Sequence, residues 1–386
     1  VNWSSDGPGV VEVNSRGVAL ANAAGACNIT ASVADTSASA TMSVTAPRRF
    51  VYIPSRYGTV SGFELNAANG SLTPLAGSPY LVEAGTPTGI TGTPDGSKVF
   101  VTGPGAVRTF FRDSNTGELT RGPRDLSFSV DRARVDPTGE FLVSSDSNLE
   151  RVRVLRILDD GTFEPVTQAI SRLTRNFAIQ SVENFYLFAG LTAPVSRNLH
   201  AFQLGDGPSL ELRSSLSVSE SEINDLSYFR FRGRHLFAAT SSDSGPNIGI
   251  VHLDSNGELS LHGPLAKYRR TVAPRTADLV VTRVGPRLAV GGFSGASNNV
   301  EVYDLGAKGT LAANAMPAEN LTLVSGTTRL HTIPGSRYVL VNVGNAGDNL
   351  FIFDFLEGPG QLVWSGSDIG GNLSISGLYH YAEPVR

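Results

Sequence analysis

Arginines form the set of side chains in this sequence with the clearest binding chemistry. Three lie together in the segment KYRRTVAPR (267–275), a pair lies well before them, and one stands alone. A guanidinium donates paired hydrogen bonds to carboxylates, sulfates and acidic glycans. We therefore expect an anion-binding face, and a solvated rim with local ion pairs is the simpler interpretation of the same side chains. The candidates are Arg132, Arg172, Arg175, Arg269, Arg270 and Arg275.

Two histidines, His331 and His380, are the candidates for proton transfer. Imidazole titrates near neutral pH and can act as a general acid or base. The six histidines of the chain form no H-x-H or H-E-x-x-H motif, and we predict that they fall on different repeats and strands. A structural or exposed role is therefore the simpler expectation for each histidine, and no metal site is predicted.

Motifs that bind cofactors are missing from the sequence. No segment has the spacing of a phosphate-binding or dinucleotide-binding glycine loop, and GGFSGAS (291–297) lacks the spacing of a nucleophile elbow. Cys27 is the only cysteine, which excludes an internal disulfide and a cysteine-ligated metal site. The turns DSNTGE (113–118) and DSNGE (254–258) lack the spacing of a calcium loop. We predict neither a cofactor nor a metal ion.

Composition limits the classes of partner. The net charge is −4, whereas nucleic-acid binding needs a concentrated basic surface. The sequence has no apolar run of about 18 residues, so no membrane-spanning helix is predicted. Only 17% of the residues are charged and 42 are glycine, a composition that favours short strands joined by tight turns.

A repeated strand pair predicts the elements that would position these side chains. Short apolar strands recur at intervals of about 42 to 52 residues, in the range of four-stranded propeller blades. These strands are FVYIP (50–54), KVFVT (98–102), EFLVS (140–144), FYLFA (185–189), HLFAA (235–239), RLAVG (287–291) and YVLVN (338–342). A second strand follows each of them, and NVEVYDL (299–305) shows the alternation typical of a half-buried strand.

Turns and the two chain ends complete this pattern. Segments such as DSNTGELTRG (113–122) contain the Asp, Asn and Gly that tight hairpins need, and a third strand follows them. The C-terminal segment SISGLYHYAEP (374–384) has the pattern of an inner strand and would complete the first blade. The sequence therefore predicts an all-β fold, a seven-bladed β-propeller closed by the C-terminal strand.

Two segments of the repeat resemble a known family. TPTGITGTPDGSKVFVTG (86–103) and NAANGSLTPLAGSPY (66–80) resemble lactonase-type seven-bladed propellers, which include 6-phosphogluconolactonase-like proteins and YVTN-repeat surface proteins. The resemblance implies this fold over about residues 49–386 and a lactone-binding mouth of His, Glu and Arg side chains. The Pro-His step common at the entry of the family's inner strands is absent from the corresponding segments, so no base carries over. These segments are PTGI (87–90), VDRA (130–133), RNFA (175–178), NDLS (224–227), TADL (276–279) and TTRL (327–330).

The first residues have a different character. VVEVNSRGVALANAAG (10–25), NITASV (28–33) and SASATMSVT (37–45) resemble the second half of a group 2 bacterial immunoglobulin-like domain. We expect residues 1–46 to form this partial β-sandwich and residues 47–386 to form the propeller. Either the sequence is a piece of a longer protein, or a neighbouring subunit supplies the missing strands and links molecules by strand addition.

Two functions follow from this organisation. The leading hypothesis is a non-enzymatic bacterial module, extracellular or on the cell surface, for adhesion, assembly or structural protein interaction. A protein or glycan partner would then bind at the propeller face. The alternative is a lactonase-like hydrolase or isomerase that acts on a small anionic lactone. An observation that would discriminate between the two is whether His331 or His380 lies within hydrogen-bonding reach of a carboxylate and an arginine in one pocket.

Overall fold

We analysed the chain as a computed structural model. It divides into two compact units, one of Val1–Arg49 with Ala382–Arg386 and one of Phe50–Tyr381, and each is described by itself. The structure describes residues 1–21, 25–44, 48–55, 57–67, 69–83, 86–103, 106–125, 130, 132–146, 151–170, 173–192, 198–205, 209–219, 222–241, 247–267, 274–282, 285–292, 298–313, 315–323, 326–333, 338–344, 349–355, 361–366 and 379–382.

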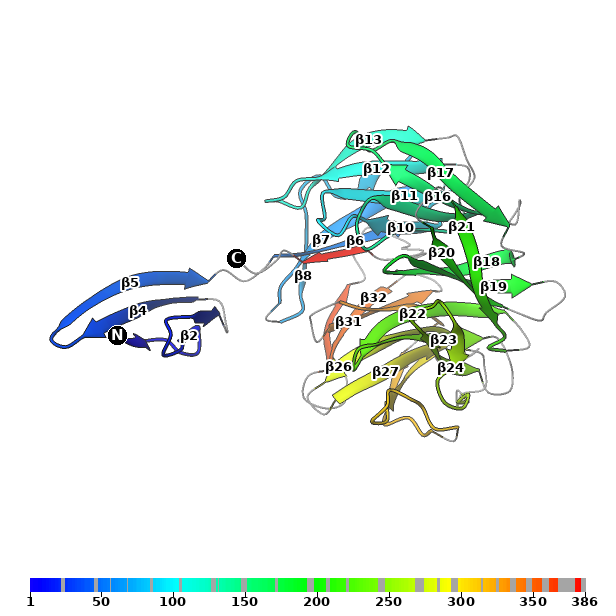
Figure 1. Ribbon diagram of the computed structural model, residues 1–386. Helices are drawn as coiled ribbons and strands as arrows, with labels where there is room; N and C mark the ends of the chain where they lie inside the picture. The colour runs from blue at the N-terminus through cyan, green and yellow to red at the C-terminus, as the bar shows by residue number, and fades with distance from the viewer. Residues whose placement is uncertain are drawn as a thin grey trace. The chain divides into compact units, whose positions relative to one another are not determined.

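The larger unit is built of antiparallel sheets arranged around a common centre (Figure 1). Within the described ranges it contains no helix, six four-stranded sheets and one five-stranded sheet. The strands of each four-stranded sheet follow one another in sequence, so each sheet is a meander of hairpins. This is the all-β organisation that the repeated strand pairs predicted.

We call the first strand of each sheet its inner strand, because the inner strands of successive sheets contact one another. The inner strands are β10 (Gly89–Gly92), β14 (Arg132–Val135), β18 (Leu173–Val182), β22 (Ile223–Phe231), β26 (Pro274–Thr282), β30 (Gly326–Thr332) and β34 (Tyr379–Ala382). The second strands are β11 (Lys98–Gly103), β15 (Phe141–Asp146), β19 (Phe185–Thr192), β23 (Arg234–Ser241), β27 (Gly285–Gly292), β31 (Tyr338–Gly344) and β6 (Arg49–Ser55).

The remaining strands complete each sheet on its outer side. The third strands are β12 (Ala106–Arg112), β16 (Arg151–Ile157), β20 (Leu199–Leu204), β24 (Ile248–Leu253), β28 (Asn298–Asp304), β32 (Asn349–Asp354) and β7 (Thr59–Leu65). The fourth strands are β13 (Leu119–Asp125), β17 (Phe163–Ile170), β21 (Leu210–Leu216), β25 (Leu259–Leu261), β29 (Glu319–Leu323), β33 (Gln361–Gly366) and β8 (Leu72–Pro74). The short strand β9 (Tyr80–Leu81) pairs with β7.

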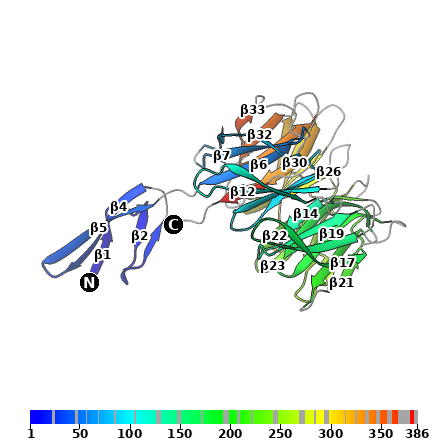
Figure 2. The same ribbon diagram turned by 90° about the horizontal axis from the view of Figure 1, so that it is seen from above.

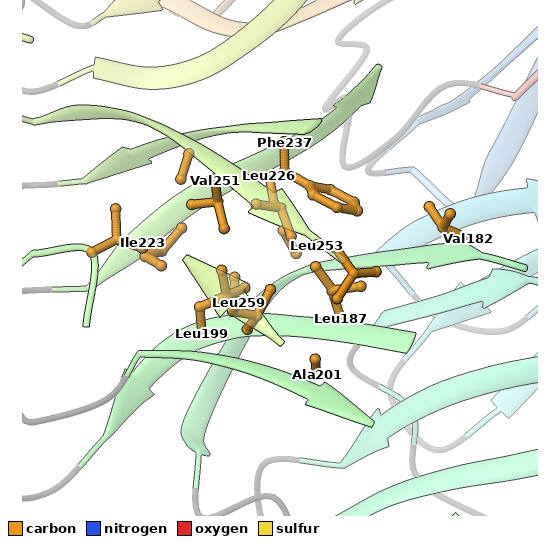
Figure 3. Close-up of a cluster of buried hydrophobic side chains, with 14 of the residues drawn as sticks. Val182, Leu187, Leu199, Ala201, Ile223, Leu226, Phe237, Val251, Leu253 and Leu259 are labelled. Atoms are coloured by element: carbon orange, nitrogen blue, oxygen red, sulfur yellow. The ribbon is translucent and has the colours of Figure 1, made fainter. Parts of the chain in front are cut away.

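Apolar clusters between neighbouring sheets form the core. The cluster between the β18–β21 and β22–β25 sheets includes Leu187, Ala201, Leu226, Phe237 and Val251, all essentially inaccessible to solvent (Figure 3). Side chains of both sheets alternate between the two faces, so each sheet contributes one face to each neighbouring cluster. Burial of such side chains is the main source of stability in an all-β domain.

The C-terminal strand closes the larger unit. Strand β34 comes from the end of the chain and lies beside β6 in the sheet β34-β6-β7-β8 (Figure 1). Val51 and Ile53 of β6 pack in one cluster with Leu340 of β31 and Ile352 of β32. The last sheet in sequence order is therefore packed against the first, and pairing with β34 covers an edge of β6 that would otherwise be open.

The N-terminal unit is small and mostly exposed. Its strands are β1 (Asn2–Ser5), β2 (Val11–Val13), β3 (Ala19–Ala21), β4 (Gly25–Val33) and β5 (Thr36–Val44). They form a sheet of order β1-β4-β5 and a separate β2-β3 hairpin. Val11, Cys27 and Ile29 are its buried apolar side chains, and Figure 2 shows β4 and β5 as one long hairpin. The thiol of Cys27 is free and buried.

Candidate functional site

One register position recurs along the inner strands and carries a polar side chain in six of them. Each of these residues pairs with a second-strand residue whose side chain packs toward the following sheet, as Arg134 pairs with Val143 and Asp278 with Ala289. Because all six occupy the same place in the repeat, they lie at the same level of their sheets. The six are Thr91, Arg134, Gln180, Ser227, Asp278 and His331.

Most of these side chains join their own inner strand to the next one. Thr91 Oγ1 accepts a hydrogen bond of 3.1 Å from the backbone N–H of Val135, and Asp278 Oδ2 accepts one of 2.7 Å from Thr332 N. Gln180 Nε2 donates to the carbonyl of Leu226 at 2.6 Å, and Ser227 Oγ donates to the carbonyl of Ala277. These bonds satisfy backbone groups on inner-strand edges that no strand covers.

Arg134 departs from this pattern. Its side chain is exposed, and no hydrogen bond joins it to a described residue. Its electrostatic partners are Asp225 on β22 and Asp278 on β26, which belong to sheets two and three positions further along the chain. Because all three residues lie on inner strands, we call Arg134, Asp225 and Asp278 the axial site.

The surroundings of Arg134 limit the hydration of its side chain. Burial lowers the pKa of the Arg134 guanidinium, while Asp278 and Asp225 act in the opposite direction and favour its charged form. Its surface nevertheless remains open to solvent. Many protein atoms around the side chain that do not cover its surface explain both observations.

Backbone amides hold the two carboxylates in place. Asp225 Oδ1 accepts a hydrogen bond of 3.0 Å from Leu226 N, and Asp225 Oδ2 accepts one of 3.4 Å from Ala277 N on the next inner strand. Asp278 is oriented in the same way by the N–H of Thr332. Fixed carboxylates beside an exposed guanidinium can accept a proton from water while the guanidinium donates to a developing oxyanion.

For three of the predicted site residues, Arg132, Arg175 and His331, the structure describes either the side chain or the strand pairing. Arg132 is half-buried in β14, and its Nη1 donates to the carbonyl of Thr88, so it connects two neighbouring sheets. His331 is half-buried in β30, at the same register position as Asp278. Arg175 pairs with Leu191 in β18, and its side chain lies outside the described part.

The structure does not describe the side chains of the other predicted site residues. Arg275 lies in β26 and His380 in β34, with side chains outside the described part. Arg172, Arg269 and Arg270 lie outside the described residues altogether. Their role in binding stays a prediction.

The axial cluster is the grouping that the sequence analysis missed. Asp225 and Asp278 were visible in the inner-strand entries NDLS (224–227) and TADL (276–279), which were considered only for histidine. Arg134 follows Arg132 by two residues, so the alternation of the strand was the available signal. Only the closure of the ring shows that residues of three separate repeats converge.

Comparisons with known proteins place the fold. No protein-family model matches the chain, and no curated protein matches its sequence. Among solved structures, a putative 6-phosphogluconolactonase of Bacteroides fragilis is similar with a TM-score of 0.67 and 14% identity, over 86% of this chain and 98% of that chain. A periplasmic gluconolactonase of Pseudomonas aeruginosa is similar with a TM-score of 0.65 and 16% identity, over 88% and 98% of the two chains.

A third similar structure is a putative 6-phosphogluconolactonase of Bacteroides uniformis, with a TM-score of 0.65 and 15% identity over 82% of this chain and 95% of that chain. The chain therefore has a lactonase-type β-propeller fold, as the repeat resemblance predicted. Identity at this level establishes the fold and leaves the activity to be argued from the site. Within the described ranges, no helix is long and apolar enough to cross a membrane. No group of three or more His, Cys, Asp or Glu residues among those described could hold a metal ion.

Proposed function

We propose that the propeller hydrolyses a small sugar-type lactone at the axial site. One observation carries this proposal: a solvent-open guanidinium, Arg134, lies in the electrostatic reach of two carboxylates, Asp225 and Asp278, from two other sheets. Either carboxylate can act as the general base, a role for which the family resemblance supplied no residue. The similar structures described as gluconolactonases support the substrate class.

The axial residues match the charge changes of lactone hydrolysis. Water attacks the lactone carbonyl carbon and transfers a proton to the carboxylate of Asp225 or Asp278. Arg134 donates hydrogen bonds to the carbonyl oxygen as it becomes an oxyanion. The ring C–O bond then breaks, and the departing ring oxygen takes the proton from the carboxylic acid. Mixed charges also suit a polyhydroxylated substrate, because carboxylates accept hydrogen bonds from hydroxyl groups.

Initial rates with glucono-δ-lactone and 6-phosphogluconolactone, corrected for spontaneous hydrolysis, test this proposal. We expect Arg134→Met to lower kcat by about 100-fold or more, the size expected for loss of an oxyanion donor. We expect Asp225→Asn or Asp278→Asn to lower kcat by about 100-fold, because the amide cannot act as a base. Asn keeps one oxygen acceptor, which can retain the bond from Thr332 N at position 278 and one of the two backbone bonds at position 225.

Arg156→Met is the matched control, because Arg156 is an exposed arginine on the third strand of the same sheet, 3.7 Å from Glu164. It should keep the full rate. A wild-type rate that equals the uncatalysed rate with both lactones would refute the proposal.

A non-enzymatic module outside the bacterial cell is the second candidate, and the N-terminal unit favours it. Every residue of β5 except Val44 is exposed, and β5 is the last strand of the sheet β1-β4-β5. Strand β5 has no charged residue and no proline, the usual protections of a sheet edge. In this proposal the unit is half of an immunoglobulin-like domain, and a strand of another subunit pairs with β5. A protein or glycan would bind the propeller face.

Light scattering of the purified full chain tests this second candidate. Concentration-dependent polymers are expected, and the Ala40→Lys variant should be monomeric because a charge on the edge opposes strand addition. A wild-type chain that stays monomeric at high concentration would exclude self-assembly through β5.

A further inference from the structure

A cavity with charged side chains in its lining lies between two neighbouring sheets and shares no residue with the axial site. Its volume is about 370 Å³, and it opens at the turns that join β18 to β19, β22 to β23 and β24 to β25. The residues that line it include Glu183, Phe185, Arg234, His235, His252 and Asp254. The prediction that the histidines fall on different repeats is wrong for His235, His252 and His262, because His235 lies in β23, His252 lies in β24 of the same sheet, and His262 directly follows β25.

The two carboxylates of this cavity already have donors. Glu183 Oε1 lies 3.3 Å from Nε2 of His235, whose Nδ1 lies 3.0 Å from the hydroxyl of Tyr228. Asp254 Oδ1 accepts hydrogen bonds of 2.9 Å from Asn256 N and 2.8 Å from Glu258 N, so it closes its own turn. These bonds reduce the negative charge that the carboxylates present to the cavity.

His252 lies in positive surroundings. Burial lowers the pKa of the His252 imidazole, and the neighbouring His262, Arg234 and His235 lower it further, whereas Asp254 opposes them. The ring of His262 is 5.9 Å from the ring of His252 and is fixed by a contact of 2.8 Å between its Nε2 and the carbonyl of Lys308. Three basic neighbours therefore raise the electrostatic potential at His252.

Arg234 supplies the free cation of the cavity. It begins β23, its side chain is exposed, and no ion pair joins it to a described residue. An exposed arginine beside a half-buried imidazole can place two kinds of donor on one anion, the guanidinium fork and a ring N–H. Phe185 and Leu253 give the cavity an apolar part that would contact the rest of a ligand.

We propose that this cavity binds a small anionic ligand through a carboxylate or phosphate group held by Arg234 and His252. An anion between these two side chains would offset the positive surroundings that Arg234, His262 and His235 create at His252. Protonated imidazole binds an anion better than neutral imidazole, so binding takes up a proton and strengthens as the pH falls. Asp254 and Glu183 are the only carboxylates among the residues that line the cavity, and both retain their present partners.

NMR titration of the histidine side chains in the full chain tests the proposal. Sulfate is the tetrahedral probe because its charge is constant between pH 5.5 and 7.5, and acetate is the carboxylate probe; chloride keeps the ionic strength constant. Saturable shifts of the His252 resonances are expected with at least one probe, with affinity at least about threefold higher at pH 5.5 than at pH 7.5. Saturation by sulfate alone identifies a phosphate-type ligand, and saturation by acetate alone identifies a carboxylate.

Two variants and a control separate this cavity from general surface charge. Arg234→Gln and His252→Asn should each weaken binding by about tenfold. Arg232→Gln is the control, because Arg232 is an exposed arginine in the same turn and does not line the cavity. Its guanidinium lies over the Phe231 ring, 5.6 Å from the ring centroid. Non-saturable shifts with both probes, or equal loss in the Arg232 variant, would overturn the proposal. Lactone hydrolysis should be unchanged in all three variants.

Discussion

The N-terminal unit and the propeller are both made of antiparallel strands, yet they bury very different amounts of apolar surface. Among its described residues, the N-terminal unit has a buried apolar cluster of three, and β5 is exposed almost throughout. In the propeller, each sheet lies between two others, and single clusters contain more than ten buried side chains. A strand that is covered on both faces contributes much more hydrophobic stabilisation than one covered on neither.

The comparison teaches that strand pairing alone does not make a stable domain. Strands β4 and β5 are joined over nine residue pairs without a register shift, which is a longer regular pairing than most hairpins of the propeller. An isolated hairpin is nevertheless marginal in water, because its hydrogen bonds replace bonds to water. The stability of the propeller therefore comes from packing between its sheets.

The largest effect is expected from a cavity in a cluster between two sheets. Phe237→Ala removes a ring that is inaccessible to solvent, and we expect a loss of about 3–5 kcal/mol in the free energy of unfolding. Ile29→Ala in the N-terminal unit should cost about 2 kcal/mol, because its small core leaves the site partly open. In differential scanning calorimetry, each variant should lower the midpoint temperature of a different unfolding transition. A common shift of both transitions would contradict the independence of the two units.

The next effect concerns a glycine at a contact between sheets. Gly117 has a φ of 75°, and a Cβ there would lie 2.3 Å from the Phe50 ring, next to the carbonyl that accepts the Tyr52 hydroxyl. We expect Gly117→Ala to destabilise the propeller by about 2–3 kcal/mol, from backbone strain together with the forced shift of the ring. Urea denaturation measures the change.

Gly233→Ala is the matched control for Gly117. Its φ is 83°, and no atom lies within 4 Å of a Cβ built there. It should lose only about 1 kcal/mol, the cost of a positive φ in a residue with a side chain. Equal losses in the two variants would show that the Phe50 contact adds nothing.

A smaller effect is expected from pH. The pKa of His252 is lowered in the folded state, so the unfolded chain binds more protons at this group. Its contribution to stability is therefore complete above the unfolded pKa of about 6.5 and is lost as the pH falls through that value. The variant His252→Asn should lose less stability than the wild type between pH 7.5 and 5.5. Parallel pH profiles from thermal melts would exclude a role of this histidine.

The smallest effect is expected on the exposed strand. Ala40 lies in β5 and is exposed, so Ala40→Lys should change the free energy of unfolding by less than about 0.5 kcal/mol. Chemical denaturation of the N-terminal transition measures it. A loss above 1 kcal/mol would show that β5 is covered in solution, and the contrast between the two units would then be smaller.

Much of the fold could be predicted because its signals are local. Alternation in segments such as NVEVYDL (299–305) and glycine turns such as that at Gly257, with a φ of 84°, arise from the chain's own geometry. The complementary ends of the repeat also predicted that the last strand joins β6, and the structure shows that pairing. The candidate site residues stay predictions, because several of the arginines lie outside the described residues, and the axial site consists of other residues.

By itself, the sequence determined the kind of strand, the turns between strands and the order in which they form sheets, because these depend on neighbours along the chain. Only the tertiary structure decided that Arg134 lies within the electrostatic influence of Asp225 and Asp278, and that His252 lies among other basic groups. These interactions join residues from different strands, and in the axial site from different sheets. Their geometry depends on how the sheets pack around the axis, which no local spacing encodes.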